Sequence, residues 1–181
     1  MSKSGSRRKA ATIRHRQIRQ KARTQDFADS QPRFVVDVML GRLAKWLRIA
    51  GFDALYSNRY TDDELVALSQ KEQRILLSRD TRLLVRKAVT RFIYLESDDV
   101  QKQLGQILGI TGIRRFPALF TRCLYCNEVL EKIDRERVCK RVPPFVLKTQ
   151  PHFKMCPNCS KIYWAGTHRK AVIRTLENLL P

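Results

Sequence analysis

Four of the five cysteines form two Cys-x-x-Cys pairs in the last third of the 181-residue chain. The first pair is Cys123 and Cys126, and the second is Cys156 and Cys159, with 29 residues between the pairs. A Cys-x-x-Cys turn presents two thiolates to one side of a metal ion, and a second pair completes a closed tetrahedral site of the kind that holds structural zinc. The spacing therefore predicts a zinc ribbon. Two disulfides, or reduced cysteines without a metal, are the alternative.

Acidic side chains that follow four short apolar segments form the second candidate site: Asp37, Asp62 and Asp63, Asp80, and Asp98 and Asp99. Carboxylates gathered in one crevice repel one another unless a cation lies among them, and hard oxygen ligands select Mg²⁺ or Mn²⁺. Such an ion polarises a phosphodiester and activates water for in-line attack. We therefore expect one or two such ions among these acids.

Each charged residue of this set also has a structural interpretation. Helix capping could explain several of the acids, namely Asp62, Asp63, Glu64, Asp80, Asp98 and Asp99. Asp37 is the hardest to explain in this way, because an acid directly beside an apolar strand is costly to desolvate without a partner. Three arginines near the acids could bind substrate phosphates or neutralise the carboxylates in salt bridges: Arg42, Arg48 and Arg79.

A predicted alternation of strands and helices positions these acids. Short apolar segments at 34–36, 54–56, 75–78 and 92–95 are typical of buried strands, and a helical pattern follows each of them. Strands that alternate with helices predict an α/β fold with a parallel sheet covered by helices on both faces. Right-handed crossovers bring the carboxyl ends of such strands to one edge, where ligands bind. The candidate acids should therefore lie at that edge.

The formal charge of +19, from 36 basic and 17 acidic side chains, is spread over the whole chain. This surplus indicates a polyanionic partner, most simply nucleic acid, with an anionic membrane surface as the alternative. No apolar run approaches the length of about 18 residues that a membrane span needs. Cysteines in metal spacing suit a reducing compartment, and we expect the protein to be cytoplasmic.

Residues 1–33 carry 10 basic and 2 acidic side chains and almost no large apolar residues. Ile13 and Ile18 form no apolar stripe, so the segment is predicted to be a disordered basic arm that binds RNA or DNA. A transit peptide that directs the protein to an organelle is the alternative, because such peptides are also rich in Arg and Ser and poor in acid.

Several stretches occur in an order that resembles the Mut-seven C-terminal RNase family: 37–48 (DVMLGRLAKWLR), 51–53 (GFD), 75–80 (ILLSRD), 97–99 (SDD) with Gln103 and Leu104, 122–127 (RCLYCN) and 156–168 (CPNCSKIYWAGTH). The resemblance runs from about Phe34 to about His168. It implies a three-layer α/β fold similar to the PIN-like nucleases, a C-terminal zinc ribbon, and divalent-metal-dependent RNase activity. Residues at the family's acidic positions are Asp37, Asp62, Asp80 and Asp98, and Ser78 stands where the family usually has threonine. With this resemblance, we expect Asp37 and Asp80 to bind Mg²⁺ or Mn²⁺, and Asp62 and Asp98 to complete the catalytic site.

We therefore expect a basic arm (1–33), a PIN-like domain (34–118), a zinc ribbon (119–168) and a C-terminal helix (169–181). The predicted function is a metal-dependent ribonuclease that acts on RNA, for example ribosomal RNA or tRNA. A non-catalytic protein that binds RNA or the ribosome is the alternative. In the ribbon, Tyr163 and Trp164 could stack on bases or pack the core, and His168 could contact RNA.

Overall fold

The computed structural model describes residues 3–22, 27 and 31–180. Its larger part is a parallel sheet with the strand order β2-β1-β3-β4, which confirms the predicted α/β class. The strands are β1 (Phe34–Val36), β2 (Ala54–Leu55), β3 (Ile75–Ser78) and β4 (Phe92–Tyr94). Every residue of β1 and β3 is buried, as expected for parallel strands that helices cover on both faces.

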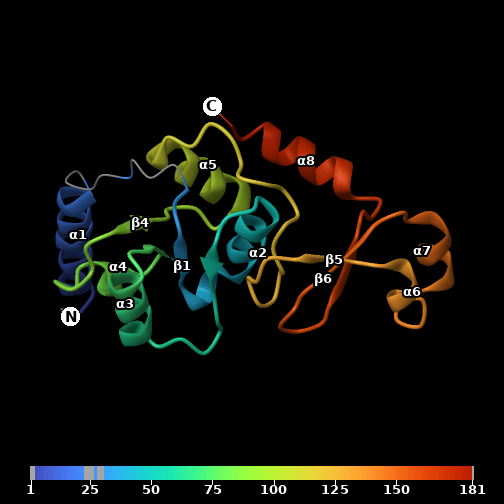
Figure 1. Cartoon of the computed structure of the whole chain (residues 1–181). Helices are drawn as coiled ribbons and strands as arrows, with labels where there is room; N and C mark the ends of the chain where they lie inside the picture. Colours follow the sequence, from blue (N-terminus) through green and yellow to red (C-terminus); the bar gives the residue numbers. More distant parts are fainter. Residues whose placement is uncertain (1–2, 23–26, 28–30, 181) are drawn as a thin grey trace.

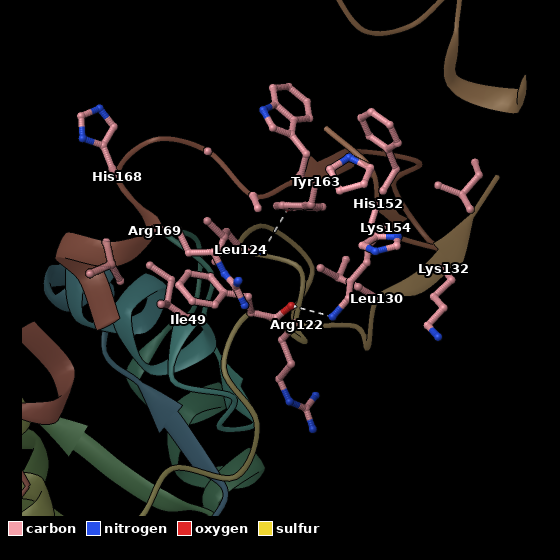
Figure 2. A pocket seen from close by; sticks show the side chains of 18 of the residues that line it. Ile49, Arg122, Leu124, Leu130, Lys132, His152, Lys154, Tyr163, His168 and Arg169 are labelled. Carbon is pink, nitrogen blue, oxygen red and sulfur yellow. Dashed lines mark hydrogen bonds between the residues drawn. The ribbon is translucent and has the colours of Figure 1, made fainter. Parts of the chain in front are cut away.

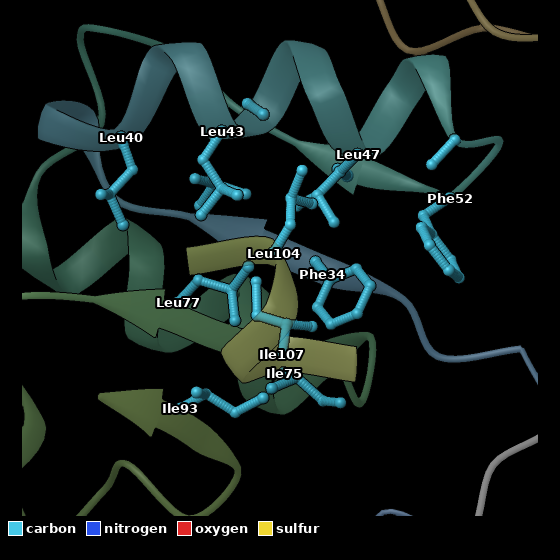
Figure 3. Close-up of a cluster of buried hydrophobic side chains, with 14 of the residues drawn as sticks. Phe34, Leu40, Leu43, Leu47, Phe52, Ile75, Leu77, Ile93, Leu104 and Ile107 are labelled. Carbon is cyan, nitrogen blue, oxygen red and sulfur yellow. The ribbon is translucent and has the colours of Figure 1, made fainter. Parts of the chain in front are cut away.

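The helices α2 (Gly41–Ile49) and α5 (Val100–Thr111) cover one face of the sheet (Figure 3). Apolar side chains at helical spacing in both helices pack against the strand residues of this face. They are Leu43 and Leu47 from α2, Leu104 and Ile107 from α5, and Phe34, Ile75 and Leu77 from the strands. Full burial of each such side chain contributes about 1.5–3 kcal/mol, so this cluster is the main core.

The opposite face of the sheet is covered by α3 (Asp62–Lys71) and α4 (Thr81–Leu84). A second apolar cluster lies between these helices and the strands: Leu65, Val66, Leu83 and Leu84 pack against Val35, Leu76 and Phe92. Helices therefore flank both faces, which confirms the predicted three-layer arrangement. We call residues 31–118, with this sheet and its helices, the sheet domain.

The structure of residues 3–22 differs from the predicted disordered arm. These residues form the helix α1 (Lys3–Ala22), which lies beside α4 and β4 (Figure 1). Ile18 is buried in the second apolar cluster, with 3% of its surface exposed. The Nε of Arg14 donates to Thr81 Oγ1 at 3.2 Å. These tertiary contacts position a helix that apolar periodicity does not indicate. The rest of the predicted arm, apart from 27 and 31–33, lies outside the described residues.

The C-terminal part contains a three-stranded antiparallel sheet in the order β5-β6-β7. The strands are β5 (Glu131–Ile133), β6 (Phe153–Met155) and β7 (Ile162–Trp164), and α6 (Arg135–Val138) and α7 (Pro144–Thr149) lie between β5 and β6. The ribbon's own core is small and consists mainly of Val138, Val142 and Phe153. The last helix, α8 (Arg169–Glu177), then returns to the sheet domain near α5 (Figure 1), where Leu176 is fully buried in the main core.

Candidate functional site

The carboxyl ends of β1 and β3 lie side by side at the centre of the sheet. Because β2 lies on one side of this pair and β4 on the other, the strand order reverses between β1 and β3. Open α/β sheets bind ligands at such a switch point, in the crevice outside the carboxyl ends of the strands. Asp37 directly follows β1, while Ser78 ends β3 and Asp80 comes two residues later. We call this place the carboxylate edge.

Ser78 connects the two acids of the carboxylate edge. Its hydroxyl donates to Asp37 Oδ2 at 2.5 Å and accepts from the backbone N–H of Asp80 at 2.8 Å. Asp37 has 4% of its surface exposed, and among the described residues no Lys, Arg or His forms a salt bridge with it. Burial of a carboxylate that no salt bridge compensates is costly, and a bound cation would offset this cost.

Asp80 also caps a helix, as the structural interpretation of the sequence predicted. Its Oδ1 accepts the backbone N–H of Arg82 at 2.7 Å, at the start of α4. The second oxygen makes no hydrogen bond within the described residues, and the side chain is only half-buried. Asp80 can therefore cap α4 and still offer one oxygen to a metal ion.

The other predicted acids have different surroundings. Asp62 is exposed and pairs with Arg86 at 3.1 Å, and Asp63 pairs with the same arginine at 2.6 Å. Asp99 caps α5, which confirms its structural interpretation, whereas Asp98 is exposed just before it. The structure therefore does not bring the four predicted carboxylates into one cluster. Within the described part of the chain, one group of three or more His, Cys, Asp or Glu side chains is placed to hold a metal ion, and it consists of four cysteines.

Two of the predicted phosphate-binding arginines lie near the carboxylate edge in the chain. Arg42 is exposed in the first turn of α2, which the short helix η1 (Val38–Leu40) joins to Asp37. Arg79 is half-buried and directly precedes Asp80. Neither arginine forms a salt bridge with any described residue, so both can supply positive charge to an anionic ligand.

The position of Arg48 does not fit its predicted role in substrate binding, because only 2% of its surface is exposed. Its Nε donates to the carbonyl of Ala54 at 2.9 Å, and its Nη1 donates to the carbonyls of Leu124 at 2.8 Å and Tyr125 at 3.1 Å. Burial lowers the pKa of the guanidinium. Arg48 therefore ties β2 to the first Cys-x-x-Cys turn and is not placed to contact a substrate.

The four cysteines of the ribbon converge on one point. Their sulfurs lie within 4.8 Å of one another, and the Sγ atoms of Cys123 and Cys159 are 3.6 Å apart. A tetrahedral ion with Zn–S bonds of about 2.3 Å places its sulfurs about 3.8 Å apart, so the site could hold zinc. All five cysteines of the chain are free, which contradicts the disulfide alternative. The N–H of Cys126 donates to Cys123 Sγ at 3.3 Å, as is typical of a metal-binding turn.

The thiols of this site have opposed pKa shifts. Burial raises the pKa of Cys123, but hydrogen bonds from the Tyr163 hydroxyl and from backbone N–H groups outweigh burial and lower this pKa to about 6. Burial and the neighbouring sulfurs raise the pKa of Cys126 to about 12. One thiolate therefore forms readily while its neighbour resists ionisation, and a divalent cation removes this conflict by neutralising the charge.

A buried polar junction joins the first Cys-x-x-Cys turn to the sheet domain. Asn127 follows this turn with a φ of 69°, a left-handed conformation that asparagine tolerates. Its Nδ2 donates to Asp53 Oδ1 at 2.7 Å, and its Oδ1 accepts the N–H of Ala54 at 3.0 Å. Asp53 also pairs with Arg74 at 2.6 Å. Local sequence patterns do not indicate this junction, because Asp53 and Asn127 are 74 residues apart in the chain.

The junction should lose stability in acid. Burial raises the pKa of Asp53, but hydrogen bonds from Arg74 and Asn127 outweigh burial and lower this pKa below its ordinary value of 3.8. A carboxyl of this kind stabilises the fold above its unfolded-state pKa, and the contribution disappears as the pH falls through the folded-state pKa. The free energy of unfolding, measured in urea, should therefore be higher for the unsubstituted chain than for Asp53→Asn at neutral pH. A difference that persists unchanged at pH values well below 3.8 would contradict this prediction.

His168 lies apart from the carboxylate edge. It is exposed at the start of α8 and lines a cavity beside the ribbon, near Arg169 (Figure 2). A ligand of His168 would therefore occupy a different place from a ligand of Asp37.

A family model described as the Mut7-C RNAse domain matches residues 32–176. This stretch begins just before β1 and ends in α8, so it contains the whole parallel sheet, the carboxylate edge and the four cysteines. The chain belongs to the Mut7-C RNAse domain family. Membership of this family implies that RNA is the substrate class.

Neither the curated proteins nor the solved structures that were compared with the Mut7-C chain gave a match. The helix α1 lies before the matched stretch. Within residues 3–22, 27 and 31–180, no helix is both long enough and apolar enough to cross a membrane.

Proposed function

We propose that this Mut7-C chain is a ribonuclease that uses a divalent metal ion at the carboxylate edge. The observation that carries the proposal is the buried carboxylate of Asp37, which is bonded to Ser78 at the switch point of the sheet and has no salt-bridge partner among the described residues. Asp37 and Asp80 would hold Mg²⁺ or Mn²⁺. Hard carboxylate oxygens suit these ions, and Mg²⁺ usually binds through one or two carboxylates together with substrate phosphates.

The ion would polarise the scissile phosphodiester and activate water for attack on phosphorus. Ser78 would orient the Asp37 carboxylate by donating to Oδ2, which leaves Oδ1 for the ion. Arg42 and Arg79 would stabilise the negative charge that develops on the phosphoryl oxygens. Participation of Asp62 and Asp98 stays a prediction, and Asp62 would first have to leave its salt bridge with Arg86.

A non-catalytic RNA-binding protein is the second candidate. The observation that favours it is α1, which adds exposed basic side chains such as Arg16 and Arg19 outside the family match. Cationic helices hold the sugar-phosphate backbone without any need for a reactive centre. Together with the formal charge of +19, this helix would suit a protein that stays bound to a large RNA.

Cleavage of labelled RNAs by the zinc-loaded chain distinguishes the two candidates. Single-stranded and structured RNAs would be incubated with Mg²⁺, with Mn²⁺, or with Ca²⁺, which prefers more ligands in a looser geometry. The ribonuclease proposal predicts cleavage that depends on Mg²⁺ or Mn²⁺. Binding of these RNAs without cleavage under any of the conditions would support the non-catalytic candidate.

Removal of the Ser78 hydroxyl should weaken the metal site. Ser78→Ala is expected to lower metal affinity or activity by about 10- to 100-fold, the usual effect of losing a residue that orients a metal ligand. Ser78→Thr keeps the hydroxyl and is expected to retain most of the activity. The measurement is the Mn²⁺ concentration that gives half-maximal cleavage, because a purely structural defect would not shift it. Identical Mn²⁺ requirements for the alanine and threonine variants would contradict this role.

A further inference from the structure

A cavity of about 790 Å³ lies between the ribbon sheet, the end of α2 and the start of α8 (Figure 2). Ile49, the last residue of α2, lines this cavity, whereas the first turn of α2 closely follows Asp37. A helix rises about 1.5 Å per residue, so the length of α2 separates the cavity from the carboxylate edge by roughly 12 Å. The cavity is therefore a separate candidate site, which we call the ribbon cleft.

A row of side chains across the ribbon sheet lines the cleft (Figure 2). In the strand register Lys132 lies directly opposite Lys154, and Lys154 lies directly opposite Tyr163. Like charges opposite each other on neighbouring strands are unfavourable. Among the described residues, neither lysine forms a salt bridge that would neutralise it. An anionic ligand in the cleft would stabilise this pair.

Three arginines add positive charge to a cleft whose other lining residues are mostly apolar. Arg122, Arg135 and Arg169 line it together with the two lysines, and Asp134 is the single acid among the described lining residues. The side chains of Lys132 and Arg135 are exposed and make no hydrogen bond within the described part of the chain, so they are available to a ligand. A surplus of this kind attracts ligands that carry several phosphates.

Trp164, at the end of β7, adds an aromatic side chain to the cleft, with 40% of its surface exposed. Tyr163 has a different role: its hydroxyl contacts Cys123 Sγ at 3.1 Å and accepts the N–H of Leu124 at 3.1 Å, so it supports the cysteine site. Because side chains alternate along a strand, Trp164 leaves the opposite face of the ribbon sheet from Lys132 and Lys154, and a ligand of all three has to pass around the sheet. Unpaired bases stack on an exposed aromatic ring, whereas a duplex hides the faces of its bases. The cleft therefore favours a single strand.

We propose that the ribbon cleft binds a single-stranded segment of RNA, with Lys132 and Lys154 on its phosphates and Trp164 stacked on one of its bases. The inference rests on the proposed function, because it takes RNA as the substrate. It deepens that function by assigning a second contact region, separated from the carboxylate edge by the length of α2. The cleft would hold RNA while the carboxylate edge acts on another part of the same molecule.

The test is binding of RNA to the full zinc-loaded chain carrying Asp37→Asn. This background prevents cleavage without a chelator, which would also remove zinc. A fluorescent single-stranded RNA is titrated at several salt concentrations against this chain, and against the same chain with Trp164→Ala or Lys132→Gln. Loss of one base stack should weaken binding about 5- to 150-fold in Trp164→Ala. Loss of one phosphate contact should reduce the slope of log K against log salt by about 0.7 in Lys132→Gln.

Lys102→Gln is the matched control, because it removes the same charge from an exposed position on α5. It should leave both the affinity and the salt slope unchanged. Trp164→Phe keeps an aromatic ring and should recover most of the binding, which separates stacking from a folding defect. Melting temperatures of all variants would be compared for the same reason.

Binding of Trp164→Ala and Lys132→Gln as tight as that of Lys102→Gln would overturn the ribbon cleft as an RNA site. Equal affinity for duplex RNA would overturn the preference for single strands. The nuclease is tested separately with unsubstituted Asp37. Cleavage by that chain, with normal RNA binding by the cleft variants, would leave the proposed function intact. RNA binding that depends on the ribbon cleft, without any cleavage by the chain with unsubstituted Asp37, would overturn the proposed ribonuclease function. It would leave the ribbon cleft as an RNA-binding site.

Discussion

Asp37→Asn is expected to lower the rate of RNA cleavage by at least about 1,000-fold. Asparagine keeps the shape of the side chain but removes the charge that would hold the divalent ion. Loss of a metal that polarises the phosphoryl group removes several kcal/mol of transition-state stabilisation, and about 4 kcal/mol corresponds to this factor. Because Asp37 is buried and has no salt bridge with any described residue, its replacement should leave the fold intact.

The measurement is single-turnover cleavage of a labelled RNA, with the melting temperature of each variant as the check on folding. Asp63→Asn is the matched control, because Asp63 lies exposed on α3 and is paired with Arg86, which follows α4. The same assay ranks the other predicted acids, and Asp80→Asn should approach the loss seen for Asp37→Asn. Undiminished cleavage by Asp37→Asn would exclude the carboxylate edge as the catalytic site.

Replacement of Cys126 by serine is expected to release zinc and unfold the ribbon. Structural zinc supplies on the order of 10 kcal/mol to the folding of small domains. The buried apolar core of the ribbon consists of only Val138, Val142 and Phe153 among the described residues, and such a core does not support a fold alone. Because Arg48 holds the first Cys-x-x-Cys turn against β2, the melting temperature of the sheet domain should fall as well.

Zinc would be counted with a colorimetric chelator after denaturation, and unfolding would be followed by circular dichroism. Cys139→Ser is the matched control, because this thiol is exposed and donates to the carbonyl of Glu136, away from the four ligands. It should retain one zinc ion per chain and the melting temperature of the unsubstituted protein. If Cys126→Ser kept as much zinc as Cys139→Ser and melted at the same temperature, the four-cysteine site would not be a structural zinc site.

The α/β class and the four-cysteine cluster followed from signals that lie within a few consecutive residues. The strands 34–36 and 75–78 are short apolar runs, and each Cys-x-x-Cys turn is complete in four positions. The capping box between Thr61 and Glu64 is equally local and is present in the structure. Such features were predictable because the hydrogen bonds or ligand bonds that define them join near neighbours in the chain.

Other features depend on which distant segments meet, and local patterns do not encode this. The strand order places Ser78 beside Asp37, 41 residues earlier in the chain, and creates the switch point between β1 and β3. Arg48 was predicted to bind phosphate, but the folded chain buries it, and it donates a hydrogen bond to the first Cys-x-x-Cys turn. The buried side chain of Ile18 packs α1 into the second apolar cluster, in a segment whose composition predicted disorder.

The residue types alone therefore specified the class of the sheet, the four-cysteine cluster and the acidic residues worth testing. Packing of the whole chain specified which of these acids approach each other, which cation is buried, and where Lys132 faces Lys154. The physical reason is that hydrophobic periodicity and turn chemistry act over a few residues. Burial and cross-strand register are set only when segments far apart in the chain come into contact.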